Sequence, residues 1–211
     1  MPKKMGIVFV ILGAVLMMSA LLLFLNNEAI DANAGKQSGE VLSQIKAEDP
    51  APPETTMQPT EETGETQPID PTMTVKVING YGYIGYLTIP KLELELPVMD
   101  DWDYDRLNIA PCRHFGSTKT DDLVIAAHNY DTHFGRLKTL EIGDQVSFTD
   151  MDGVVSNYQI VRTGTLHPDA VDAVQYSENH LVLYTCTYGG EERVAVFCDR
   201  VTDEINGEKH E

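Results

Sequence analysis

The stretch Gly6–Leu25, GIVFVILGAVLMMSALLLFL, contains twenty consecutive residues without a charge. An α-helix rises about 1.5 Å per residue, so a helix of this length spans roughly the 30 Å hydrocarbon core of a bilayer. Residues 6–25 are therefore predicted to form a transmembrane helix. Two lysines, Lys3 and Lys4, precede the run, whereas NNEAIDANAG after it carries only acidic charges. This asymmetry predicts a single-pass protein with residues 1–5 in the cytoplasm and the rest of the chain outside the cell membrane.

A cleaved signal peptide is the alternative to an anchor. The small residues ANA at Ala32–Ala34 resemble a cleavage site. The apolar run is longer than the hydrophobic region of a typical signal peptide, which has about 7 to 15 residues. The pattern therefore favours an uncleaved anchor.

Residues 26–80 have a different composition from the anchor. They include EDPAPPETTMQPTEETGETQPIDPT, which is rich in Glu, Pro and Thr and almost free of large apolar side chains. Such a segment cannot bury enough surface to offset the entropy lost on ordering. We predict that residues 26–80 form an acidic, disordered extracellular linker, that residues 81–205 form the folded domain and that residues 206–211 are a polar tail.

The folded domain is predicted to consist of β-strands. In IGYLTIPKLELELPVMD, which begins at Ile84, apolar and polar residues alternate with the period of half-buried strands. Short strand-like runs follow, separated by Gly, Asp, Asn or Pro turns, and only YDRLNIAP and FGRLKTL suggest short helices. Many short strands of this spacing indicate an all-β barrel or sandwich.

The charge of the chain argues against nucleic acid as a partner. The net charge is −18, and the 15 lysines and arginines form no basic stripe. Binding to a phosphate backbone depends on cationic side chains that release counterions. We therefore expect no nucleic-acid partner.

The chain has three cysteines, Cys112, Cys186 and Cys198. In an extracytoplasmic domain an odd number leaves at least one thiol outside a disulfide. Cys112 is expected to lie in a loop, and the sequence leaves undecided whether Cys112 and Cys198 form a disulfide. None of the cysteines has the C-x-x-C spacing of a zinc site. The DMDG sequence at Asp150–Gly153 is better explained by a turn than by a calcium loop.

The segment LVLYTCTYGGEERVAVFCDR, Leu181–Arg200, predicts two strands joined by a turn at Gly189–Gly190. Cys186 would end the first strand and Arg193 would open the second, so a thiol and a guanidinium would lie close together. Cys198 has the opposite strand parity from Arg193 and is expected to point inward. Arg200 is a rival arginine at the far end of the strand. The simpler explanation is that Cys186 is a small core residue and Arg193 a solvated charge.

A cysteine nucleophile needs a helper, because a thiol of ordinary pKa is only about 3% ionised at pH 7. His128 ends the apolar run LVIAAH, which would place it at the rim of a strand. The set His128, Cys186 and Arg193 would supply an acid or base, a nucleophile and a cation for a developing oxyanion. The other histidines lie in polar, loop-like surroundings: His114, His133, His167, His180 and His210. For His133, a surface position is favoured over a contact with substrate.

These segments resemble the sortases, cysteine transpeptidases on the outer face of Gram-positive membranes. The resemblance runs from about Gly82 to Val201. IGYLTIPKLELELPV is similar to the opening strands of the family, and CRHFGS with LVIAAHN is similar to the segment that leads to its catalytic histidine. FGRLKTLEIGDQV resembles the stretch that follows. VLYTC resembles the Thr-Leu-x-Thr-Cys signature with Val182 in place of the first threonine, and Arg193 stands at the position of the family's arginine.

The resemblance implies a closed eight-stranded β-barrel with Cys186, His128 and Arg193 at one mouth of a peptide groove and Thr185 as a further donor to the oxyanion or substrate. It implies cleavage of an LPxTG-like sorting signal between Thr and Gly through a thioacyl intermediate. The acceptor would be an amine from a cell-wall precursor or a pilin lysine, and no metal or organic cofactor is needed. The compact form leans toward a class D-like sortase. A peptidase that releases its product to water and a non-catalytic tethered binding module are the alternatives.

Overall fold

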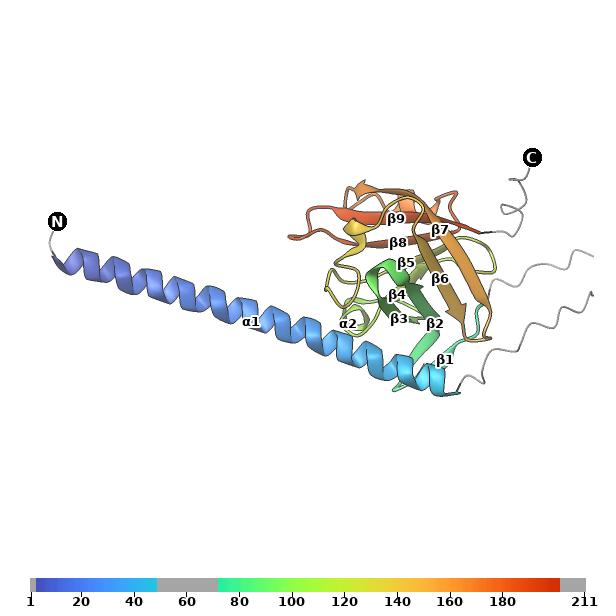
Figure 1. Cartoon of the computed structure of the whole chain (residues 1–211), viewed down its shortest axis with the longest axis horizontal. Coiled ribbons are helices and arrows are strands. Elements are labelled where there is room, and N and C mark those ends of the chain that lie inside the picture. The colour runs from blue at the N-terminus through green and yellow to red at the C-terminus, as the bar shows by residue number, and fades with distance from the viewer. Residues whose placement is uncertain (1–2, 49–71, 202–211) are drawn as a thin grey trace, which may run out of the picture.

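The structure of the chain, a computed structural model, describes residues 3–48 and 72–201. The predicted tail at 206–211 and positions 49–71 of the predicted linker lie outside the described residues. The described part comprises one long N-terminal helix and a β-barrel decorated with short helices (Figure 1).

Helix α1 is continuous over Lys3–Glu48. Its first part projects away from the barrel (Figure 1), and the large apolar side chains from Ile7 to Leu25 are exposed. An 18-residue window of this part has a mean hydropathy of 2.9 and is 0% buried. By length and composition, α1 is apolar enough to cross a membrane.

The second part of α1 differs from the predicted linker, because residues 26–48 are helical and lie along the barrel. One face of this part is buried, and its four buried residues recur at helical spacing: Ala34, Ser38, Val41 and Ile45. Val41 and Ile45 pack in a cluster with Ile78, Tyr83 and Met99. The predicted linker treated residues 26–48 like the Pro- and Thr-rich segment that follows them. Their apolar side chains are few, but they fall on one face of the helix and are buried there.

Eight strands close into a barrel, as predicted. Around the ring their order is β2, β3, β4, β5, β8, β9, β7 and β6, and β6 pairs with β2 to close it. Strand β1 pairs with β2 outside this ring, so the folded unit begins before the predicted Tyr81. The bounds are β1 Lys76–Ile78, β2 Tyr81–Ile89, β3 Leu94–Met99, β4 Cys112–Phe115, β5 Leu123–Ala126, β6 Gln145–Asp150, β7 Val155–Leu166, β8 Leu181–Cys186 and β9 Arg193–Arg200.

Short helices fill the connections between strands. Helix α2 covers Tyr104–Leu107 and the 3-10 turn η2 covers Leu137–Thr139, at the two places where the sequence suggested helices. Helix α3, Asp172–Gln175, lies in the β7–β8 connection, and the 3-10 turn η1, Pro90–Leu92, joins β2 to β3. Large side chains, including Phe134, Phe148 and Tyr158, are fully buried in the main core.

Gly85 lies at the seam where the barrel closes. It pairs with Val98 of β3 on one side and with Asp150 of β6 on the other. Its φ of 150° is a conformation that side chains disfavour, and a Cβ at this position would lie 2.1 Å from the carbonyl oxygen of Thr149. Closure of the β2–β6 pairing therefore requires a glycine here.

We expect Gly85→Ala to lower the free energy of unfolding of the detergent-solubilised full chain by about 3 kcal/mol or more, because the added methyl group meets backbone rather than a movable side chain. Chemical denaturation followed by circular dichroism measures the change. Gly164→Ala in β7 is the matched control, since its Cβ would meet nothing within 4 Å. Equal effects of the two substitutions would show that the seam does not depend on the glycine.

Candidate active site

The pairing of β5, β8 and β9 brings the three predicted catalytic residues to neighbouring strand ends. Strands β5 and β8 are parallel, with Ala126 opposite Tyr184, and the N–H of Ala127 donates to the carbonyl of Tyr184 at 3.2 Å. When this register is extended by two residues on each strand, His128 lies opposite Cys186. In the antiparallel β8–β9 pair, Cys186 lies directly opposite Arg193.

The three residues also share a face of the barrel. Their chain neighbours point into the barrel: Ala127 packs in the main core, Val194 packs against it, and Thr185 is 3% exposed. Because successive side chains of a strand point to opposite faces, His128, Cys186 and Arg193 have the outward parity. All three are half-buried. The structure thus brings the predicted set together on the outer face at one end of the barrel.

Arg193 is held by the turn between β8 and β9. Its Nη1 donates to the carbonyl oxygens of Gly190 and Glu192, each at 3.1 Å. Gly189 and Gly190 have φ values of 96° and 79°, which matches the turn predicted at these glycines. Neutral carbonyls do not cancel the charge of the guanidinium, so a cation remains beside Cys186.

Thr185 faces the barrel interior, where it is 3% exposed. Its hydroxyl donates to the carbonyl oxygen of Ala127 at 2.8 Å. This hydrogen bond ties β8 to the residue that precedes His128. In the structure Thr185 is therefore placed to position the histidine, and its side chain does not point where the predicted oxyanion or substrate contact would need it.

His128 is surrounded by the loop that follows it. Its carbonyl oxygen accepts a hydrogen bond from the N–H of Phe134 at 3.1 Å, and its ring lies 4.8 Å from the ring of Tyr130. Burial lowers the pKa of His128 from its usual value of 6.5. The neutral imidazole is therefore favoured at neutral pH, which suits a group that accepts a proton.

His133 is buried, so the prediction of a surface position was wrong; it is 0% exposed and lies under α1. The Ser38 hydroxyl donates to the carbonyl oxygen of Ile109 at 2.7 Å and also lies 3.2 Å from Nε2 of His133. Since the hydroxyl has one hydrogen, Nε2 of His133 must donate to it. Burial, reinforced by His128 and opposed by Asp31, lowers the pKa of His133 to about 4.

A cavity of about 260 Å³ opens beside Arg193 and Tyr184. Trp102 and His114 are among its lining residues, together with side chains from the β7–β8 connection. The hydroxyl of Tyr184 lies 2.7 Å from Nδ1 of His114, and the Trp102 ring packs edge-on against His114 with centroids 4.9 Å apart. The sequence placed His114 in loop-like surroundings, because no local pattern indicates that β4 lies near β8.

The other two cysteines are structural. Cys112 opens β4 rather than lying in a loop, and both Cys112 and Cys198 are 0% exposed. Cys112 packs in the cluster beneath α1, whereas Cys198 packs inside the barrel as predicted, and all three cysteines are free thiols. Burial raises the pKa of Cys112 to about 12 and also raises that of Cys198. Cys112 and Cys198 thus do not form the disulfide that the sequence left undecided.

Arg200 and the DMDG sequence also have structural roles. Arg200 pairs with Asp121 and donates to the Ser156 hydroxyl at 2.7 Å, at the opposite end of β9 from Arg193. Asp150 caps its own turn by accepting from the N–H groups of Asp152 and Val154, each at 2.9 Å. Within residues 3–48 and 72–201 no group of three or more His, Cys, Asp or Glu side chains is arranged to hold a metal ion.

Comparison with known proteins agrees with this geometry. The family model described as Sortase domain matches residues 87–201. Sortase D of Bacillus subtilis (strain 168) is 32% identical over 128 residues, which cover 56% of this chain and 64% of that relative. The chain therefore spans less than two thirds of the relative's length.

Solved structures share the fold. Sortase A from Corynebacterium diphtheriae has a TM-score of 0.53 at 19% identity, over 58% of this chain and 62% of that one. Sortase C1 from Streptococcus agalactiae has a TM-score of 0.51 at 24% identity, over 60% of this chain and 72% of that one. From the match of its domain and its barrel, the chain belongs to the sortase family.

We expect iodoacetamide to label Cys186 in the folded full chain and to leave Cys112 and Cys198 unlabelled until the protein unfolds. The two buried thiols are inaccessible and rarely ionised, whereas Cys186 is half-buried on the outer face. Peptide mass spectrometry of chain treated before and after denaturation checks this. A folded protein in which Cys186 resists the reagent would contradict the placement of its sulfur.

We expect the free energy of unfolding to fall as the pH is lowered from about 6.5 to about 4. His133 has a pKa of about 4 in the fold against an ordinary value of 6.5, so the unfolded chain binds more protons in this interval. The shift corresponds to a loss of at most about 3 kcal/mol. Chemical denaturation at several pH values should show a flatter profile for His133→Gln than for wild type, and parallel profiles would rule out this contribution.

Proposed function

We propose that the chain is a membrane-anchored cysteine transpeptidase. It cleaves an LPxTG-like sorting signal between Thr and Gly and joins the new carboxyl end to an amine. The observation that carries the proposal is the convergence of His128, Cys186 and Arg193 on the outer face of three adjacent strands, within the stretch that matches the sortase family.

In the first half-reaction, the sulfur of Cys186 attacks the carbonyl carbon of the signal's threonine. His128 accepts the thiol proton and passes it to the departing amide nitrogen as the C–N bond breaks. Arg193 donates to the oxygen on which negative charge develops. The products are a thioacyl enzyme and a free peptide that begins with glycine.

In the second half-reaction, an amine attacks the thioester carbon. His128, neutral again, accepts a proton from the incoming nitrogen, and the sulfur of Cys186 departs as the new amide forms. Water competes with the amine for the thioester. No metal or organic cofactor takes part in either half.

The apolar part of α1 supports the location. With Gly6–Leu25 across the bilayer and Lys3 and Lys4 inside, the barrel lies outside the cell membrane. This single-pass arrangement brings the enzyme to surface-protein sorting signals and to an amine from a peptidoglycan precursor or a pilin lysine. The similarity to a protein named Sortase D supports a class D-like member in a Gram-positive organism.

We expect Cys186→Ala to abolish both the covalent adduct with a sorting-signal peptide and the joined product, because the atom that forms the thioester is lost. Cys198→Ala, which changes a thiol in the barrel interior, should retain most of the activity. Mass spectrometry of the full chain incubated with LPxTG-like peptides and candidate amines reads both species. Joined product from Cys186→Ala at the wild-type rate would rule out the proposal.

A second pair of variants tests the cation. We expect Arg193→Lys to lower kcat by about a hundredfold, because a point charge replaces a fork of donors near the oxyanion, and Arg200→Lys to leave kcat close to wild type. Rates of product formation at saturating peptide make the comparison.

The same assay with the wild-type chain separates the alternative functions. A product released only to water would identify the chain as a peptidase, and the absence of any adduct would favour a non-catalytic binding module.

A further inference from the structure

The loop after His128 is closed on itself. The N–H of Phe134 donates to the carbonyl oxygen of His128 at 3.1 Å, and the N–H groups of His133 and Gly135 donate to that of Tyr130 at 3.0 and 2.8 Å. The loop 129–134 therefore forms a compact unit with the imidazole at its start. Whatever holds this unit also fixes His128.

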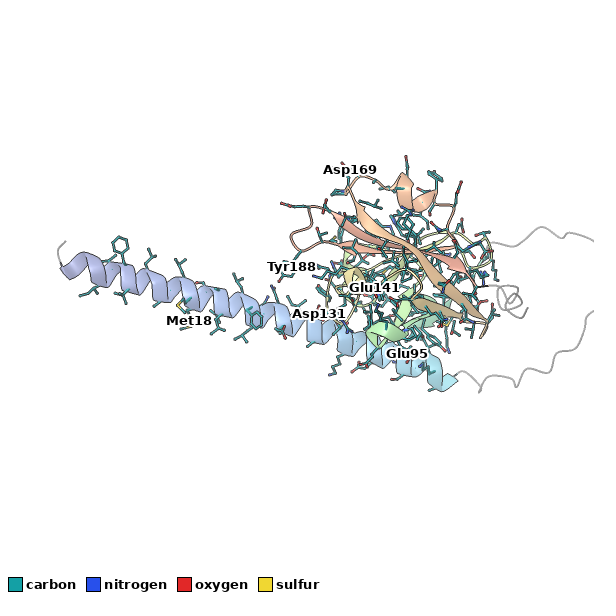
Figure 2. The ribbon with its side chains drawn as sticks, turned by 45° about the horizontal axis from the view of Figure 1, so that its top comes forward. Met18, Glu95, Asp131, Glu141, Asp169 and Tyr188 are labelled. Carbon is teal, nitrogen blue, oxygen red and sulfur yellow. The ribbon has the colours of Figure 1, made fainter. Side chains whose placement is uncertain are left out.

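Asp31 of α1 holds the middle of the loop. Its carboxylate accepts hydrogen bonds from the N–H groups of Asp131 at 2.8 Å and Thr132 at 3.1 Å, and a third from the Thr132 hydroxyl. Figure 2 shows Asp131 close to the helix. Burial by itself raises the pKa of Asp31, but these hydrogen bonds outweigh it and the pKa is lowered. The carboxylate is thus ionised at neutral pH, which strengthens each bond.

Ser38, two turns further along the same face of the helix, holds the end of the loop. It accepts the hydrogen bond from Nε2 of the buried His133. The His133 ring lies 5.5 Å from the Tyr130 ring, which in turn lies 4.8 Å from the ring of His128. A line of packed rings therefore runs from the helix to the imidazole.

Gly35 lets the helix come this close. It lies between Asp31 and Ser38, and a Cβ at this position would be 2.8 Å from Cγ2 of Thr132 and 2.9 Å from its Cβ. Gly39, one turn later on the helix, has nothing within 4 Å of its ideal Cβ. The close approach is therefore specific to the contact with the loop.

We propose that Asp31, Gly35 and Ser38 form a docking face on α1 that positions the loop 129–134, and through it His128, beside Cys186. The anchor helix is then a part of the active site and not a passive tether. This inference rests on the proposed transpeptidase function, because it assigns the three residues a positioning role for that reaction. A shift of an acid or base by about 1 Å can cost a large part of the rate.

The pair Gly35→Ala and Gly39→Ala in the full chain tests the docking face. Both exchange a helical glycine for alanine, so both raise the helix propensity equally, but only the first forces the helix away from Thr132. We expect Gly35→Ala to lower kcat by at least about fivefold with little change in the KM for the signal peptide. Gly39→Ala should match wild type in both.

Asp31→Ala and Asp31→Asn test the hydrogen bonds. The alanine removes all three acceptor contacts, whereas the asparagine retains one side-chain oxygen. We expect kcat to fall most for Asp31→Ala and to recover in part for Asp31→Asn. The amides of Asp131 and Thr132 should exchange with deuterium about tenfold faster in Asp31→Ala than in wild type.

The ring signal of His128 gives a readout that needs no reaction. NMR spectra of the chain with 13C-labelled histidine show this signal, and its loss in His128→Gln assigns it. The substitutions Gly35→Ala and Asp31→Ala should change the chemical shift of the His128 ring, whereas Gly39→Ala should leave it unchanged. If wild type forms no joined product, the proposed function fails while this signal still decides the positioning. An unchanged His128 signal and unchanged amide exchange in both Gly35→Ala and Asp31→Ala would overturn the inference.

Discussion

The parallel pairing of β5 with β8 is the constraint on which the rest of the site depends. It aligns two strand ends that are 58 residues apart in the chain, as the hydrogen bond from Thr185 to Ala127 shows. Because the side-chain period of a strand is two, a slip of one residue would turn either His128 or Cys186 into the barrel interior. Alternate residues of both strands, Leu123 and Ile125 in β5 and Leu181 and Leu183 in β8, pack in the main core, so the residues that continue this parity, Ala127 and Thr185, point inward, and His128 and Cys186 point outward.

Burial then gives chemically similar side chains different roles. Cys112 and Cys198 are fully enclosed and their pKa values are raised, whereas Cys186 lies half-buried at a strand end beside a guanidinium. The histidines divide in the same way. His128 is half-buried at the site, and His133 is enclosed beneath α1 with a pKa of about 4.

The long helix α1 joins its apolar first part rigidly to the barrel. A disordered linker would leave the barrel free to turn above the bilayer, but residues 26–48 continue the helix and pack against the barrel. The contact between Asp31 and Thr132 joins residues 101 positions apart and lies four residues after His128. Helix α1 and His128 thus belong to one packed body in the described structure.

The sequence by itself determined the apolar segment, the short alternating strands and the Gly189–Gly190 turn, because these follow from local periodicity and turn chemistry. Its motifs also singled out His128, Cys186 and Arg193, which the strand pairing brings to neighbouring strand ends. It also indicated that Cys198 points inward, since parity along one strand is local. The burial of His133, the cavity lined by Trp102 and His114 and the docking of residues 26–48 were decided only by the tertiary structure. Each of these depends on which distant segments meet across the barrel, and a polar or sparsely apolar stretch carries no local signal of the partner that will bury it.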